Sequence, residues 1–123
     1  MILVFLILSV NEAQKISEWR PENRTGVSAE TGLMKSWTAD GPTLLWSNLE
    51  LTDGYSQPSF GTNTIYITGQ KGSDDILYAL DMNGKILWQT AMGRAWNGSN
   101  PESRATPTVE GNKVYTCSGC FKW

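Results

Sequence analysis

The residue types best suited to chemistry are few in this chain, and two of them lie close together near its C-terminus. Cys117 and Cys120 form a single Cys-x-x-Cys pair, and the 123-residue sequence contains no His. A structural zinc site needs about four ligands, and the sequence has neither a second cysteine pair nor a His to complete one. The lack of His also removes the commonest general base and rules out the c-type haem attachment motif, which has a His directly after the second Cys.

The cysteine pair leaves two interpretations open. Redox-active pairs usually lie at the N-terminus of a helix, where the helix dipole lowers the pKa of the thiol. Here the preceding residues, Lys113 to Thr116, have the composition of a strand. This context favours incidental strand and turn cysteines over a redox pair. We therefore predict no catalytic, cofactor-binding or metal-binding residue from the sequence.

Composition places the chain among small globular domains. Its hydrophobic content is 40%, which permits a packed core, and six Trp is a high count for this length. The net charge is −2 with no block of like charge, so no electrostatic footprint for nucleic acid is present. Arg20 and Arg24 are best interpreted as solvated or loop-bracing cations.

The first ten residues, Met1 to Val10, form one apolar run that turns polar at Asn11. Spanning a bilayer takes about 20 apolar residues, so the run is too short for a transmembrane helix. It fits the apolar region of a secretory signal peptide over residues 1–14, although a positive n-region is missing. This predicts an exported protein with no membrane span in the mature chain; the alternative is a buried strand.

Residues 15–42 are expected to be irregular but ordered. Pro, Asn and Gly interrupt the segment after Trp19, and this aromatic side chain is expected to hold the segment against the body of the protein. A short helical turn is predicted over Glu30 to Ser36. The repeat region then occupies residues 43–123.

The clearest element is a β-hairpin made from Ile76–Met82, the turn Asn83-Gly84, and Lys85–Gln89. Asn-Gly between apolar runs predicts a type I′ turn, in which both central residues have positive φ. The first strand is apolar on both faces, so we expect it to be covered on both sides. Its two faces comprise Ile76, Tyr78, Leu80 and Met82 on one side and Leu77 and Ala79 on the other.

Further short strands are predicted from β-branched and aromatic runs between turn residues. With the hairpin, those within residues 57–90 form a four-stranded antiparallel meander. A polar loop is expected over Gly69–Asp74 and a longer loop over Ala91–Arg104. The additional predicted strands are Thr43–Asn48, Gln57–Phe60, Thr64–Thr68, Thr106–Val109 and Lys113–Cys117.

The pattern repeats along the chain. Pro58 aligns with Pro107 at an offset of 49, and Trp46 aligns with Trp88 at an offset of 42. Periods of this size with four strands per unit are typical of β-propeller blades, which need neighbours to bury both faces. The predicted fold is therefore all-β, with about one and a half blades of an incomplete ring. We favour an N-terminal fragment of a longer propeller over an unusual oligomerising unit.

These residues resemble a known family. The pattern Ala79-x-Asp81-x-Asn83-Gly84-Lys85-x-x-Trp88 is similar to the tryptophan-docking repeat of quinoprotein alcohol dehydrogenases and the wider PQQ-like β-propeller repeat proteins. The family pattern, Ala-x-Asp-x-x-Thr-Gly-Lys-x-x-Trp, has a turn one residue longer. Residues 19–28 resemble the Trp-Arg-Gly-Pro-x-Arg-x-Gly opening of secreted bacterial members, with Pro21-Glu22 in place of Gly-Pro. The resemblance covers nearly everything from Trp19 to Cys117.

The motif residues are expected to be structural. Trp88 can lay its indole across a neighbouring blade, Asp81 can accept hydrogen bonds from turn amides, and Gly84 supplies a position with positive φ. The resemblance implies, first, an exported non-catalytic propeller that binds a protein partner and needs no cofactor. Its alternative is the N-terminal part of a PQQ-dependent alcohol or sugar dehydrogenase that holds PQQ with calcium. A third hypothesis is that this polypeptide has no activity alone and is poorly stable or associates.

Overall fold

The computed structural model describes residues 25–27 and 31–120 of the chain. The predicted signal peptide and the contacts expected of Trp19, Arg20 and Arg24 lie outside these residues. Within the described part the protein contains strands and no helix, so no helix there is long and apolar enough to cross a membrane. The helical turn predicted over 30–36 is absent from its described residues, 31–36.

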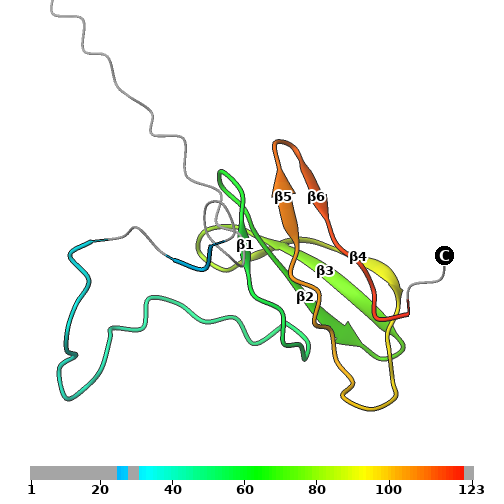
Figure 1. Ribbon diagram of the computed structural model, residues 1–123, viewed down its shortest axis with the longest axis horizontal. Coiled ribbons are helices and arrows are strands. Elements are labelled where there is room, and N and C mark those ends of the chain that lie inside the picture. Colours follow the sequence, from blue (N-terminus) through cyan, green and yellow to red (C-terminus); the bar gives the residue numbers. More distant parts are fainter. Residues whose placement is uncertain (1–24, 28–30, 121–123) are drawn as a thin grey trace, which may run out of the picture.

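The strands form two antiparallel sheets that do not close into a ring (Figure 1). The larger sheet is a meander in the order β1-β2-β3-β4, and the smaller one is the β5–β6 hairpin, which stands beside β1. The all-β prediction and the four-stranded meander are confirmed. The strands are β1 (Ser59–Phe60), β2 (Ile65–Lys71), β3 (Asp74–Leu80), β4 (Ile86–Arg94), β5 (Thr108–Glu110) and β6 (Lys113–Tyr115).

The strand β3 is buried on both faces, as its sequence predicts. On one face Ile76, Tyr78 and Leu80 join Ile65 in the main core cluster. On the other face Leu77 and Ala79 are equally buried. Burying a large apolar side chain contributes about 1.5–3 kcal/mol, so this one strand carries much of the stabilisation of the sheet.

Segments from outside the meander cover both faces of β3. Leu51 packs against the core cluster, and the Thr52 hydroxyl hydrogen-bonds the Tyr78 hydroxyl at 2.8 Å. On the opposite face the chain after residue 102 crosses the sheet, where Thr68 Oγ1 donates to the Ala105 carbonyl oxygen at 2.9 Å. The sheet therefore lies between two irregular segments.

The turn between β3 and β4 differs from the predicted type I′ turn. Gly84 has φ 81°, but Asn83 does not have positive φ. The Gly84 N–H donates to the Asp81 carbonyl oxygen at 3.0 Å, and Asp81 Oδ1 accepts the N–H groups of Asn83 and Lys85, both at 2.9 Å. This fits a three-residue loop, a type I turn followed by a left-handed glycine. The two hydrogen bonds accepted by the Asp81 side chain stabilise this loop. They confirm the prediction that Asp81 accepts hydrogen bonds from the turn amides.

Two predicted loops are partly strand. β2 continues to Lys71 and β3 begins at Asp74, so the loop predicted over Gly69–Asp74 shrinks to Gly72 and Ser73. Gly72 has φ 62°, and a two-residue turn with one positive φ at its first position fits type II′.

The last strand of the meander is longer than predicted. β4 runs to Arg94 rather than Gln89 because it pairs with the whole of β3, through two register shifts. In contrast to β4, β6 is shorter than predicted, because it ends at Tyr115 and not at Cys117.

The strand predicted over Thr43–Asn48 does not form. Leu44 is 77% exposed and Leu45 is 86% exposed, and these residues pair with no described strand. The segment is instead held at the β3–β4 turn. A Cβ added to Gly84 would clash with the Trp46 ring, and the Asn48 side-chain amide donates to the Gly84 carbonyl oxygen at 2.7 Å.

The contact between Trp46 and Gly84 can be tested by replacing the glycine. Gly84→Ala adds both strain at positive φ and a clash with the indole, so we expect the free energy of unfolding to fall by about 2–4 kcal/mol, measured by urea denaturation. Gly111→Ala is the matched control, because Gly111 has φ 58° and open space around its Cβ. Equal losses in the two variants would contradict a packing role for Trp46.

Candidate ligand pocket beside Asp75

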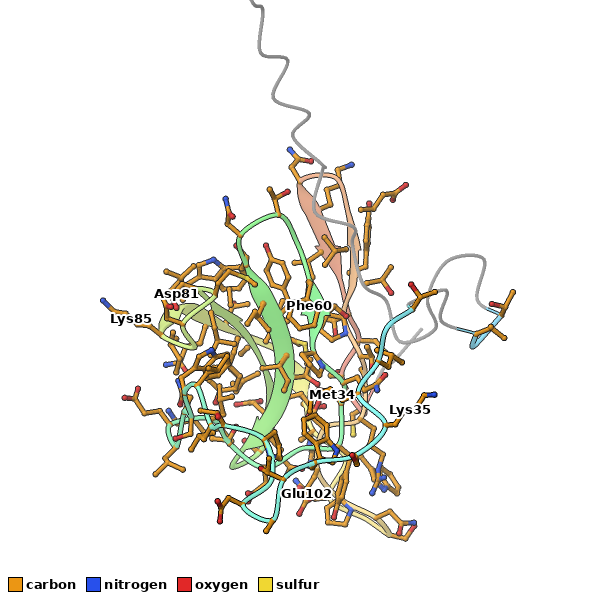
Figure 2. All side chains as sticks on the ribbon, turned by 90° about the vertical axis from the view of Figure 1, so that its left-hand side faces the viewer. Met34, Lys35, Phe60, Asp81, Lys85 and Glu102 are labelled. Carbon is orange, nitrogen blue, oxygen red and sulfur yellow. The ribbon has the colours of Figure 1, made fainter. Side chains whose placement is uncertain are left out.

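The described residues form a pocket of about 390 Å³ at the end of the sheet opposite the β3–β4 turn. Figure 2 shows Glu102, one of its lining residues, far from Asp81 and Lys85 at that turn. The walls come from the start of β3, the loop after β4 and the chain after β6. The lining residues are Asp75, Trp96, Asn100, Glu102, Arg104, Ala105, Cys117, Ser118 and Gly119.

Asp75 is the most unusual residue of the pocket. It is only 2% exposed, and its Oδ2 accepts the N–H of Gly119 at 2.7 Å. Its Oδ1 is buried and has no hydrogen-bond partner among the described residues. Burying a carboxylate is costly unless it is paired or fully hydrogen-bonded, so this oxygen is a place where a donor would be strongly favoured.

The loop after β4 is fixed by bonds to the edge of β2. Gln70 Oε1 accepts the Glu102 N–H at 2.7 Å, and Gln70 Nε2 donates to Asn97 Oδ1 at 2.5 Å. In the same loop, Asn100 with φ 54° and Glu102 with φ 79° are the two non-glycine residues with positive φ among the described residues. Strained backbone of this kind is concentrated at functional sites, and here both examples line the pocket.

Trp96 forms an aromatic wall. Its indole N–H donates to the Ser99 carbonyl oxygen at 2.9 Å, which fixes the orientation of the ring. The ring lies against Gly98, where an added Cβ would clash with it, and a Cβ added to Gly119 would lie 2.9 Å from the backbone nitrogen of Trp96. The side chain is nevertheless 50% exposed, so the indole is held in place and still accessible.

The charges of the pocket are mixed. Asp75 and Glu102 bring two carboxylates, and Arg104 brings one guanidinium. The guanidinium of Arg104 lies 4.6 Å from the centre of the Tyr55 ring, and its Nη2 donates to the Pro101 carbonyl oxygen at 3.4 Å. These contacts engage the guanidinium of Arg104 with Tyr55 and Pro101.

The cysteine pair is divided between the pocket and its surroundings. Cys117 lines the pocket and is exposed, whereas the half-buried Cys120 donates its Sγ hydrogen to the Ala95 carbonyl oxygen at 3.4 Å. Both thiols are free, and neither lies at a helix terminus. Within residues 25–27 and 31–120, no group of three or more His, Cys, Asp or Glu side chains is arranged to hold a metal ion.

Sequence reasoning identified none of the residues of this pocket as a site. One signal was available, because Asp75 is followed by the apolar residues 76–80, and strand alternation places it on the same face as Leu77 and Ala79. A carboxylate at an inward-facing strand position is unusual. The contribution of Trp96 and of residues 100–105 depends on loop conformation and carried no comparable signal.

Comparisons with known proteins add nothing to this description, because no protein-family model, no curated protein and no solved structure matches the chain.

The difference between the two thiols predicts unequal reactivity. We expect a maleimide to label Cys117 several-fold faster than Cys120, because thiol reactivity follows exposure and only Cys117 is exposed. Cys117→Ser and Cys120→Ser report each thiol separately by mass spectrometry. If labelling occurs only after reduction, the two cysteines form a disulfide and the assignment of free thiols is wrong.

Proposed function

We propose that this chain is part of an exported PQQ-like β-propeller repeat protein that serves as a non-catalytic binding scaffold. The observation that carries the propeller is the contact between equivalent strands of consecutive repeats. β1 packs against β5, and the Gln57 N–H donates to Thr106 Oγ1 at 3.1 Å across 49 positions, the period of the sequence repeat. Ser59 Oγ also donates to the Pro107 carbonyl oxygen. Radial stacking of blades would bring equivalent inner strands together in this way.

A second contact supports the same arrangement. Trp46 lies on Gly84 of the following repeat unit, and Trp88 occupies the equivalent position at an offset of 42. Trp88 is 43% exposed, with the Tyr66 ring 6.1 Å away as its aromatic neighbour. If the repeat continues, the glycine of a further unit would cover Trp88 as Gly84 covers Trp46.

The scaffold role follows from how the motif residues are used. Asp81 holds the turn, Gly84 supplies positive φ and contacts Trp46, and Trp88 lies on the exposed strand β4. Each of these residues has a structural task, so the motif itself supplies no residue for catalysis or for holding PQQ. The proposal of export depends on the apolar run Met1–Val10.

The exposed side of β4 predicts self-association of the 123-residue polypeptide. Leu87 and Trp88 present apolar surface on an edge strand, which is a template for further pairing. We expect sedimentation velocity to detect oligomers, and we expect Trp88→Ala to weaken association several-fold. Trp37→Ala is the control, because Trp37 is 61% exposed but belongs to the irregular segment. A monomer with a sharp, reversible thermal transition would contradict the proposal.

The cofactor question has a direct test. We expect addition of PQQ with Ca²⁺ to produce no saturable change in Trp fluorescence beyond the absorbance effect seen with free N-acetyltryptophanamide. Ca²⁺ alone is the second control. A saturable change that requires both PQQ and Ca²⁺ would overturn the scaffold proposal and favour the dehydrogenase.

A further inference from the structure

The chain contains two Asn-Gly pairs, Asn83-Gly84 and Asn97-Gly98, and the fold places them in opposite environments. Asn-Gly is the pair in which an asparagine side chain most readily loses ammonia, because glycine has no Cβ to hinder attack by its nitrogen. We propose that Asn97 is a site of spontaneous deamidation in the folded protein and that the fold protects Asn83. This modification site does not depend on the scaffold function proposed above.

The reaction needs only water as a co-reactant. The nitrogen of Gly98 attacks Cγ of Asn97 and forms a new C–N bond, while the side-chain nitrogen leaves as ammonia and takes up the proton lost by Gly98. The product is a cyclic imide. Water then adds to one of its two carbonyl carbons and opens the ring, which gives aspartate or isoaspartate. No carbon is oxidised or reduced in either step.

The nucleophile of this reaction is accessible at Gly98. Asn97 and Gly98 are both exposed and lie outside the strands, in the loop after β4. Among the described residues the Gly98 N–H donates to no backbone oxygen. The Trp96 ring lies against one side of Gly98 without burying it. The Gly98 nitrogen can therefore lose its proton to solvent, which is the step that makes an amide nitrogen nucleophilic.

Gln70 activates the other partner of the reaction, the side-chain amide of Asn97. Gln70 Nε2 donates to Asn97 Oδ1 at 2.5 Å, and negative charge develops on this oxygen when the Gly98 nitrogen attacks. A donor already aimed at that oxygen stabilises the transition state. The orientation of the Gln70 amide is fixed by its other bonds, because Oε1 accepts the Glu102 N–H and Nε2 also donates to the Gly72 carbonyl oxygen.

The Asn83-Gly84 pair lacks these conditions. Gly84 is buried, and its N–H donates to the Asp81 carbonyl oxygen at 3.0 Å. The Asp81 carboxylate also accepts the Asn83 N–H at 2.9 Å, and this negative charge opposes the loss of a proton from a neighbouring amide. Attack by the Gly84 nitrogen requires the turn to open first, and that opening costs free energy.

Deamidation of Asn97 would alter the wall of the pocket beside Asp75. Trp96 lines this pocket, directly precedes Asn97 and packs its ring against Gly98. Either product places a carboxylate where a neutral amide was. Isoaspartate also adds one carbon to the main chain between Trp96 and Gly98, so we expect it to displace the indole from the glycine.

The test follows both Asn-Gly pairs in the full chain during incubation in mildly alkaline buffer. Trypsin cleaves after Lys and Arg, so residues 72–85 and 95–104 are recovered as separate peptides with one pair each. Mass spectrometry then measures the deamidated fraction at Asn83 and at Asn97. We expect Asn97 to react about tenfold faster or more, because Gly84 must first break its hydrogen bond and leave its buried position. Equal rates, or faster reaction at Asn83, are incompatible with the proposal.

The same incubation in concentrated urea is the matched control, since urea removes the fold and keeps the sequence. We expect the two pairs to react at similar rates in the unfolded chain, mainly because Asn83 becomes faster. A preference for Asn97 of the same size in urea would assign the difference to local sequence and would reject protection by the fold.

Two variants test the activation by Gln70. Gln70→Glu removes Nε2 but keeps an oxygen for the Glu102 N–H, and Gln70→Leu removes the donor without adding a charge. Both should slow deamidation at Asn97 several-fold and leave Asn83 unchanged, with circular dichroism to check folding. Gln89→Glu is the control for added charge, because Gln89 is exposed in β4. Unchanged rates in folded Gln70 variants, or slowing in Gln70→Glu alone, would reject the role of Gln70.

Discussion

The structure depends on the two-sided burial of β3. A strand with apolar side chains on both faces cannot be stable at the surface of a lone sheet, because each uncovered side chain forfeits about 1.5–3 kcal/mol. In this chain residues 51–52 cover Tyr78 on one face, and residues 105–107 cross the other face at Thr68 and Ser59. The irregular segments are therefore structural layers of the fold, even though they contain almost no regular hydrogen-bonded structure.

The same constraint explains which elements could be predicted from the sequence. The apolar run of β3 and the Gly positions of the turns identify the meander, because period and positive φ are local properties. The ends of the strands are not local, since β4 extends to Arg94 only because β3 is there to pair with it. The apolar residues Leu44 and Leu45 have the composition of a strand but no described partner, so no strand forms.

The turn after β3 shows how a short motif can predict a position correctly and its conformation incorrectly. Asn83-Gly84 marked the reversal of the chain, but the preceding Asp81 selected the turn type by accepting two backbone N–H groups. Gly84 was needed for positive φ, as predicted, and for a second reason that only the fold reveals, the contact with Trp46. That contact joins positions 38 residues apart and is invisible to any local pattern.

Two carboxylates at opposite ends of β3 have contrasting environments. Asp81 lies at the turn, where Oδ1 accepts the N–H groups of Asn83 and Lys85, so its side chain is committed to the fold. Asp75 is more deeply buried yet accepts a single N–H, from Gly119, and its second oxygen is left without a described partner. A buried acceptor that the fold alone required would be expected to have its bonds completed by the fold. Asp81 is such an acceptor and Asp75 is not, because Oδ1 of Asp75 is buried without a hydrogen-bond partner among the described residues.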